Sequence, residues 1–327
     1  MTQTIIGHNA QISEFLERLK SGRFPHAWIF EGPKGIGKAH VAEMLAGVIF
    51  GETPQLTSDS FSVSDGPVRQ KQLAGSYPDY RYIARKADDN GKLPQNISVG
   101  DIRSMNSFFE LQASEGGYRV AIVDAMDELN ANGANAILKT LEEPPEKSVL
   151  ILIYHRTTPM LPTIRSRCVS LKFGSLSAEN LTRCDVADNS EQTIPESLIS
   201  IADGSPGRLR TFLEANATDL LASLDDVLNS RWPEASGARF SALLGKISDT
   251  EIHVEIASAV ISNWLKQKAE TAAMSSDASR FAAAWNETQT IVARGLELKL
   301  DRSETAGALL NMLVALQKSV KGRQLAV

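Results

Sequence analysis

The stretch from Tyr118 to Phe173 constrains the fold of this chain more than any other. Val120–Val123 is a four-residue apolar run followed directly by Asp124, a pattern typical of a buried parallel strand with a carboxylate at its carboxyl end. Apolar residues at helical spacing over positions 134–141 then predict a helix that packs on the sheet and ends before two prolines. Because open α/β sheets bind ligands at the carboxyl ends of their strands, Asp124 is a candidate site residue.

Several other segments fit the same parallel sheet. Short apolar runs predict further strands at Ala27–Phe30, Tyr80–Ala84, Val149–Tyr154 and Val169–Phe173. Helical spacing of apolar residues predicts an opening helix over positions 12–19. We therefore expect an α/β domain at the start of the chain.

A glycine-rich loop follows the first of these strands. Gly32–Lys38 reads GPKGIGK, which fits the GxxxxGK pattern of a phosphate loop between a strand and a helix. Glycines let backbone N–H groups surround a phosphate, and the lysine reaches the outer phosphates. The next residue is Ala39, where a catalytic loop needs Ser or Thr to bind Mg²⁺. The candidate nucleotide-binding residues are Gly32, Gly35, Gly37, Lys38 and Asp124, although a purely structural turn also fits this pattern.

Two motifs in the central stretch are specific enough to indicate a family. Asn135–Pro145 reads NAILKTLEEPP, and Pro162–Cys168 reads PTIRSRC. These motifs resemble the ATPase-like subunits of bacterial DNA polymerase clamp loaders, which belong to the AAA+ superfamily. The resemblance is greatest to the delta-prime type of DNA polymerase III subunit, because Asp124-Ala125 stands where the gamma and tau motor subunits carry Asp-Glu.

The resemblance implies a site that does not hydrolyse ATP. Ala39 lacks the hydroxyl that binds the metal, and Ala125 lacks the carboxylate that orients the attacking water. We expect no required cofactor, no metal ligands at the site, and at most residual binding of ATP or ADP without hydrolysis.

Two arginines have roles implied by the resemblance. In this family the arginine at the position of Arg167 reaches across a subunit interface as an arginine finger, so the catalytic assignment is Arg167 acting in trans. Arg208 stands where motor relatives carry an arginine that senses nucleotide in the same chain. An ordinary surface ion pair for Arg167 and a structural salt bridge for Arg208 remain open alternatives. We expect both Arg165 and Arg167 to be exposed, since they flank a short turn.

The pattern after Phe173 is helical to the end of the chain, and the resemblance gives it a domain organisation. We expect a RecA-like AAA+ parallel-sheet domain over residues 1–173, a small helical lid domain over 174–214, and a C-terminal helical collar domain over 215–327. The collar is an amphipathic bundle by its sequence, and its role in oligomerisation is implied by the resemblance alone. We expect its tryptophans to be buried in its core, namely Trp232, Trp264 and Trp285.

Composition restricts where the protein works and what it binds alone. The chain has 327 residues, 43% of them hydrophobic, and no apolar run near the roughly 20 residues that span a bilayer. Two cysteines, Cys168 and Cys184, and an N-terminus without signal-peptide character indicate the cytoplasm. A net charge of -5 argues against a protein that grips DNA alone, so we expect DNA contact through an assembly.

Residues 51–78 and the pair Asp127 and Glu128 lead to two further predictions. Residues 51–78 contain no cysteine where related subunits often hold a structural zinc, so we expect no zinc there and a partly mobile surface insertion instead. Asp127 and Glu128 lie beyond the predicted strand end, and we interpret them as a solvated acidic pair.

The leading hypothesis is a non-catalytic subunit of the clamp loader, and so of the DNA-directed DNA polymerase assembly. The implied partners are delta and gamma/tau subunits in a pentameric ring, with the sliding clamp (beta) and primer-template DNA reached through the complex. One alternative is an active gamma/tau-like ATPase motor, which the two alanines disfavour. Another is a small-molecule kinase, which leaves the motifs at 135–168 and the C-terminal helices unexplained.

Overall fold

The chain forms two compact units. The computed structural model describes residues 4–87, 91, 93–114, 117–184, 194–215, 217–229, 237–272, 276–298 and 300–321. Met1–Asp185 with Gly204–Gly207 makes the first unit, and Val186–Asp203 with Arg208–Val327 makes the second. The expected three-domain division, with boundaries at 173 and 214, stays a prediction.

A five-stranded parallel sheet forms the centre of the first unit, as the apolar runs predict. The strands lie in the order β5 (Tyr80–Ala84), β6 (Arg119–Asp124), β7 (Ser148–Tyr154), β2 (Ala27–Glu31) and β8 (Val169–Lys172). Every residue of β2 and β7 is buried, which explains why both read as continuous apolar runs rather than as alternating ones. The predicted strands are confirmed to within a residue or two at each end.

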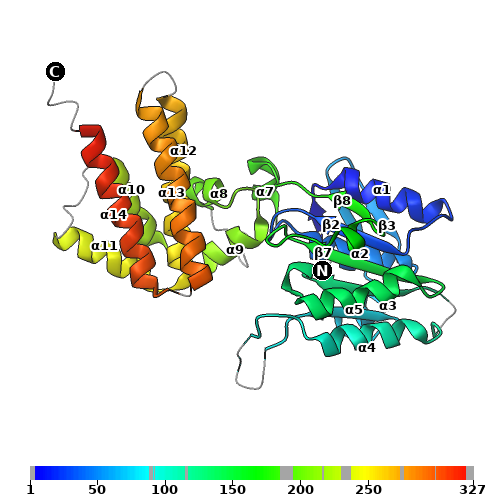
Figure 1. Cartoon of the computed structure of the whole chain (residues 1–327). Helices are drawn as coiled ribbons and strands as arrows, with labels where there is room; N and C mark the ends of the chain where they lie inside the picture. The colour runs from blue at the N-terminus through cyan, green and yellow to red at the C-terminus, as the bar shows by residue number, and fades with distance from the viewer. Residues whose placement is uncertain are drawn as a thin grey trace. The chain divides into compact units, whose positions relative to one another are not determined.

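Helices cover both faces of this sheet (Figure 1). On one face lie α1 (Asn9–Lys20) and α2 (Lys38–Ile49), and on the other lie α4 (Val99–Glu110), α5 (Ala131–Glu142) and α6 (Pro162–Arg165). Side-chain caps begin two of these helices: Ser98 accepts from the Asp101 N–H and Asn130 from the Gly133 N–H. The arrangement is the α/β architecture expected from the sequence.

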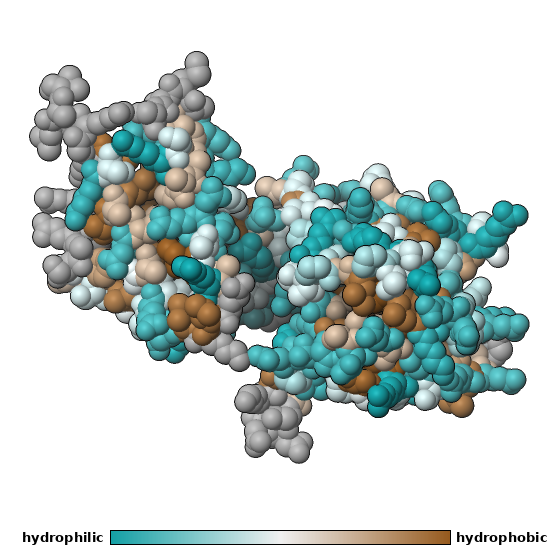
Figure 2. All heavy atoms as spheres, viewed as in Figure 1, coloured by the Kyte–Doolittle hydropathy of each residue, from teal (hydrophilic) through white to brown (hydrophobic). Residues whose placement is uncertain are grey.

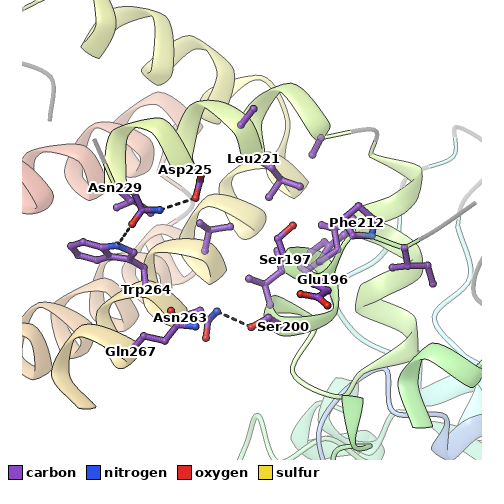
Figure 3. A pocket seen from close by; sticks show the side chains of 18 of the residues that line it. Glu196, Ser197, Ser200, Phe212, Leu221, Asp225, Asn229, Asn263, Trp264 and Gln267 are labelled. Atoms are coloured by element: carbon purple, nitrogen blue, oxygen red, sulfur yellow. Dashed lines mark hydrogen bonds between the residues drawn. The ribbon is translucent and has the colours of Figure 1, made fainter. Parts of the chain in front are cut away.

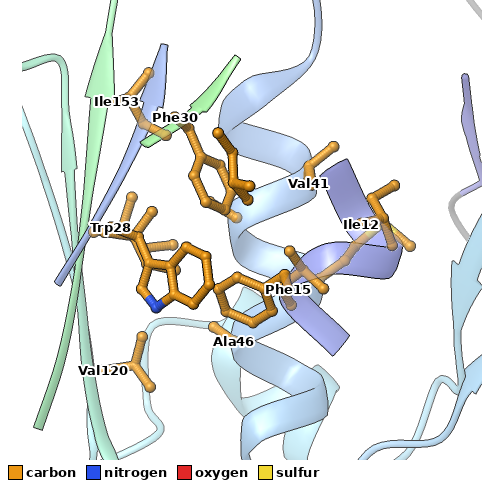
Figure 4. Packing of buried hydrophobic residues seen from close by; sticks show 14 of the residues in the cluster. Ile12, Phe15, Trp28, Phe30, Val41, Ala46, Val120 and Ile153 are labelled. Atoms are coloured by element: carbon orange, nitrogen blue, oxygen red, sulfur yellow. The ribbon is translucent and has the colours of Figure 1, made fainter. Parts of the chain in front are cut away.

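The larger core lies between the sheet and the α1–α2 layer (Figure 4). Phe15 of α1 is fully buried, and its ring centroid lies 4.6 Å from that of Trp28 and 6.1 Å from that of Phe30, both on β2. Aromatic pairs at such distances add to the free energy gained by burying their area. This packing fixes β2, and hence the start of the phosphate loop, against α1.

Residues 51–78 are an ordered part of the first unit, so the expected mobile insertion is wrong. The segment forms β3 (Pro54–Leu56), β4 (Ser60–Val63) and α3 (Pro67–Leu73), and β4 pairs on its other side with β1 (Thr4–Ile6). A buried carboxylate, Glu52, accepts hydrogen bonds from the Ser64 hydroxyl and the Arg69 N–H. Local sequence gave no sign of this cluster, because its members are polar and far apart in the chain.

The remaining helices follow β8. In the first unit lies α7 (Ala178–Arg183), and a short 3-10 helix, η1 (Met126–Glu128), follows β6. The other helices are α8 (Glu196–Ile201), α9 (Pro206–Glu214), α10 (Thr218–Asn229), α11 (Ala238–Ser248), α12 (Glu251–Thr271), α13 (Ser276–Leu298) and α14 (Arg302–Lys321). In the second unit, buried leucines and isoleucines of α10 to α12 and α14 form a helical bundle, as the sequence predicts.

The tryptophans of this bundle differ from expectation. Trp285 is 39% exposed, so its prediction as a core residue is wrong. Trp264 is half-buried, and its indole N–H donates to the Asn229 side chain. Trp232 lies outside the described residues.

The surface in view is mainly hydrophilic, with small hydrophobic patches over each unit (Figure 2). Among the helices that the structure describes, none is long and apolar enough to cross a membrane.

We predict that Phe15→Ala destabilises the first unit by about 3–5 kcal/mol, because a fully buried aromatic ring is replaced by a cavity. Denaturant unfolding followed by tryptophan fluorescence would measure the loss. The control is Leu73→Ala, at a side chain that is 55% exposed, for which we expect about 0.5 kcal/mol or less. Equal effects of the two changes would contradict the packing described here.

Candidate phosphate-loop site

The phosphate loop joins β2 to α2 at the carboxyl edge of the sheet, as the sequence predicts. At Gly32 a side chain is impossible without rearrangement, since a Cβ atom would lie 2.2 Å from the carbonyl oxygen of Phe173. Gly37 has φ of 99° and forms the N-cap of α2, a conformation that favours glycine. These two glycines are required by the backbone, whether or not a phosphate binds.

Lys38 is the first residue of α2 and is almost fully buried, at 2% exposure. Its ammonium group donates to the carbonyl oxygens of Gly32 at 2.7 Å and Pro33 at 2.5 Å. Burial lowers the pKa of Lys38 to about 8, although the charges of Asp124 and Asp127 act in the opposite direction. The side chain of Lys38 therefore joins the end of the phosphate loop to its first two residues by hydrogen bonds.

Asp124 ends β6, as expected, and lies among polar side chains from neighbouring strands. It accepts a hydrogen bond from the Tyr82 hydroxyl at 2.5 Å, and its other oxygen lies 3.9 Å from Nε2 of His155. Burial and the nearby charge of Lys38 lower the pKa of His155, which favours its neutral form. The structure thus brings the candidate Asp124 and Lys38 into one electrostatic cluster.

The outer side of the loop contacts two other segments of the same unit. The Gly207 N–H, in the first turn of α9, donates to the Gly35 carbonyl at 2.9 Å, and the Ser205 hydroxyl donates to the Lys34 carbonyl at 3.2 Å. On another side, Nε2 of His8 lies 2.8 Å from the Ile36 carbonyl oxygen. The carbonyl groups of the loop are therefore largely engaged within the chain.

Two positions lack the groups that hydrolysis requires. Ala39 follows Lys38 in α2 and offers no hydroxyl to a metal. Ala125 follows Asp124 and is 2% exposed, so it offers no carboxylate to an attacking water. Among the described residues, no group of three or more His, Cys, Asp or Glu could hold a metal ion.

Arg167 is exposed and follows α6 by two residues. Its guanidinium donates to the Thr163 carbonyl at 2.8 Å and pairs with Glu142 at 3.1 Å. Both groups are partly exposed, so this pair contributes at most about 1 kcal/mol to stability. The role of Arg167 in trans stays a prediction.

Arg208 belongs to the second unit. Its Nε donates to Glu255 of α12 at 3.1 Å, and its guanidinium lies 5.3 Å from the Phe212 ring centroid. These contacts fit the structural salt bridge that sequence analysis left open. Its proposed contact with nucleotide stays a prediction.

Three charged groups near the loop were missed or misread from the sequence. Asp127 and Glu128 are only partly exposed and both have partners: Asp127 accepts from the N–H groups of His155, Thr157 and Thr158, and Glu128 pairs with Arg85 at 2.6 Å. The interpretation of both as a solvated pair is therefore wrong. Glu31 was missed, although a single carboxylate that ends an otherwise apolar strand is a visible signal.

The second unit contains a separate groove of about 910 Å³ among α8, α9, α10 and α12 (Figure 3). Its polar side chains bond to one another: Asn263 to Ser200, and Asn229 to Asp225. It contains none of the predicted site residues.

Comparison with known proteins gives this site a context. A family model described as DNA polymerase III, delta subunit, matches residues 7–177, just over half of the chain. The chain belongs to the DNA polymerase III delta subunit family. The part of the chain that matches this family contains the phosphate loop, Asp124 and Arg167, whereas Arg208 lies beyond it.

Individual relatives are subunits of the same polymerase. The chain is 33% identical to DNA polymerase III subunit delta' of Pseudomonas aeruginosa over 185 residues, which is 55% of this chain and 53% of that subunit. It is 26% identical to subunit delta' of Bacillus subtilis over 65% of this chain and 62% of that subunit. It is 27% identical to subunit tau of Escherichia coli over 76% of this chain and 36% of that subunit. The chain thus spans about half the length of the Pseudomonas relative and about a third of tau.

We predict that Lys38 makes stability depend on pH in the alkaline range. Its pKa is near 8 in the folded chain and about 10.4 when unfolded, so between these values the unfolded chain binds the extra proton. Stability therefore rises with pH across this window. Relative to Lys38→Met, the wild-type free energy of unfolding should gain roughly 3 kcal/mol from pH 8 to 10.5, at about 1.4 kcal/mol per pKa unit.

Urea unfolding at a series of pH values would measure this change. The matched control is Lys172→Met, at an exposed lysine of the same unit, which should leave the pH dependence of the wild type intact. If the free energy of unfolding changed with pH in the same way in the wild type and in Lys38→Met, the prediction would be contradicted.

Proposed function

We propose that this chain is a delta-prime-like, non-catalytic subunit of the bacterial DNA polymerase III clamp loader. The observation that carries the proposal is the phosphate loop itself: its lysine is bonded to loop carbonyls, and Ala39 and Ala125 stand where hydrolysis needs a hydroxyl and a carboxylate. Similarity to the delta' subunits of two bacteria supports the same assignment.

In this proposal the chain acts within an assembly in the cytoplasm. Its partners are the delta and gamma/tau subunits in a pentameric ring, which loads the sliding clamp on primer-template DNA. The net charge of -5 supports DNA contact through such an assembly rather than by the chain alone. Residual ATP or ADP binding at the loop, and contacts of the C-terminal helices as a collar, are parts of the same proposal.

The proposed contribution of this chain to chemistry is Arg167, supplied in trans. A guanidinium is permanently charged and presents donors in a planar fork, which suits the charge spread over a γ-phosphoryl group. The exposure of Arg167 and the weakness of its pair with Glu142 support this role, because little energy is needed to redirect the side chain.

A second candidate is an active gamma/tau-like motor. Similarity to the tau subunit of Escherichia coli over 76% of this chain favours it, and Ala39 and Ala125 disfavour it.

We predict that the isolated chain does not turn over ATP in the presence of Mg²⁺, because the metal-binding hydroxyl and the water-orienting carboxylate are missing. Steady-state phosphate release from the purified chain, with a gamma/tau subunit as the positive control, would test this. Sustained turnover that is lost in Lys38→Ala would favour the motor candidate instead.

We predict that Arg167→Ala leaves the chain folded and able to assemble but slows ATP turnover in the reconstituted ring. An arginine finger contributes on the order of 10³–10⁵ in rate at the site it serves, so a ring with several motor sites should show a partial loss. DNA-stimulated phosphate release and clamp loading would measure it.

The matched control is Arg103→Ala, at an exposed arginine on α4. Arg165 is unsuitable as a control because it bonds to the buried Glu31. Near-normal turnover with both variants in assembled rings would show that Arg167 is not a finger.

A further inference from the structure

Glu31 is the last residue of β2 and directly precedes the phosphate loop. Its side chain is only 7% exposed, yet its two carboxylate oxygens bond to three different segments. One oxygen accepts from Nε of Arg156 at 2.7 Å, in the loop after β7. The other accepts from Nη1 of Arg165 at 3.0 Å, in α6, and from the Ser170 hydroxyl at 3.1 Å, in β8.

This carboxylate is ionised at neutral pH. Burial alone would raise the pKa of Glu31, but hydrogen bonds from Arg165 and Ser170 and the charges of both arginines lower it below its ordinary value. A buried charge that loses a partner is strongly destabilised. The ion pair with Glu31 therefore holds Arg165 at the carboxyl end of β2.

The segment that Arg165 belongs to needs such an anchor. α6 is a single turn of four residues, far below the length at which a helix is stable alone. Two of its side chains bind it to the first unit: Ile164 is buried in the core, and Arg165 bonds to Glu31. Arg167 follows two residues later, and its own contacts are to the Thr163 carbonyl and the exposed Glu142.

We propose that Glu31 is a positioning residue for Arg167: by fixing Arg165, it sets the position of the segment that carries Arg167 where this segment enters β8. The inference rests on the proposed role of Arg167 in trans. Positioning matters because a displacement of about 1 Å at a reacting centre can cost roughly 10²-fold in rate. Within the described part of the chain, the side chain of Glu31 bonds to Arg156, Arg165 and Ser170 and not to Arg167, so it acts through the Arg165 segment.

A purely stabilising ion pair makes a different prediction. It would change the stability of the chain and leave ring turnover unchanged once rings are assembled. A positioning residue lowers kcat of the ring without a change in KM for ATP, because the transition state alone loses a contact. It also has no further effect once Arg167 is gone.

The test uses reconstituted rings that contain Glu31→Gln, Arg167→Ala or both, with steady-state ATP turnover as the readout and ring assembly checked by size. We expect Glu31→Gln to lower kcat measurably, and by at most the amount by which Arg167→Ala lowers it. We expect the double variant to match Arg167→Ala alone. The matched control is Glu52→Gln, which alters another buried, hydrogen-bonded carboxylate of the same unit, remote in sequence from α6; it should leave kcat unchanged.

Arg165→Met provides a second route if Glu31→Gln does not fold. It removes the ion pair by changing the exposed partner, and Glu31 keeps its bonds to Arg156 and the Ser170 hydroxyl. We expect the same partial loss of kcat and the same absence of a further effect in the Arg167→Ala background.

The outcomes separate this inference from the proposed function. If Arg167→Ala lowers kcat but Glu31→Gln and Arg165→Met do not, the positioning role is wrong and the finger role stands. If the loss from Glu31→Gln persists in full in the Arg167→Ala background, Glu31 acts by another route and the inference is overturned. If Arg167→Ala itself has no effect, the finger role fails, and the positioning role fails with it.

Discussion

The central strand β2 is the constraint on which the rest of the first unit depends. It pairs in parallel with β7 on one side and with β8 on the other, and all five of its residues are buried. The segments of interest begin where these three strands end or start: the phosphate loop after β2, the Arg156 loop after β7, and the arginine segment before β8. A shift of β2 would therefore move all three together.

Two buried charges lie at the end of this strand, and the structure satisfies them differently. Lys38 gives its hydrogen bonds to loop carbonyls, whereas Glu31 receives its bonds from two arginines and a hydroxyl. Burial of an ion is costly unless such partners are present. The hydrogen bonds of Lys38 stay within the phosphate loop. Those of Glu31 connect the end of β2 to the Arg156 loop and to α6.

The sheet was predictable from sequence because parallel strands buried on both faces read as short continuous apolar runs. The phosphate loop was predictable because its glycines have local backbone reasons, as at Gly32 and Gly37. The fold of residues 51–78 was not, since Glu52 and Arg69 interact across 17 positions with no periodic signal between them. The partners of Asp127 and Glu31 were hidden for the same reason, because they lie 28 to 139 residues away, although Glu31 itself stands out as the one carboxylate of an apolar strand.

The two alanines and Arg167 lie in different segments of the first unit. Ala39 and Ala125 lie in α2 and directly after β6, whereas Arg167 lies beyond α6 and is supported by Glu142 of α5 and the Thr163 carbonyl. Changes at the first two positions remove a hydroxyl and a carboxylate without touching the residues that hold α6. The proposed finger depends on the end of β2 through Glu31, not on the metal or water positions. Ala39 and Ala125 therefore lie in different segments of the first unit from the residues that hold α6.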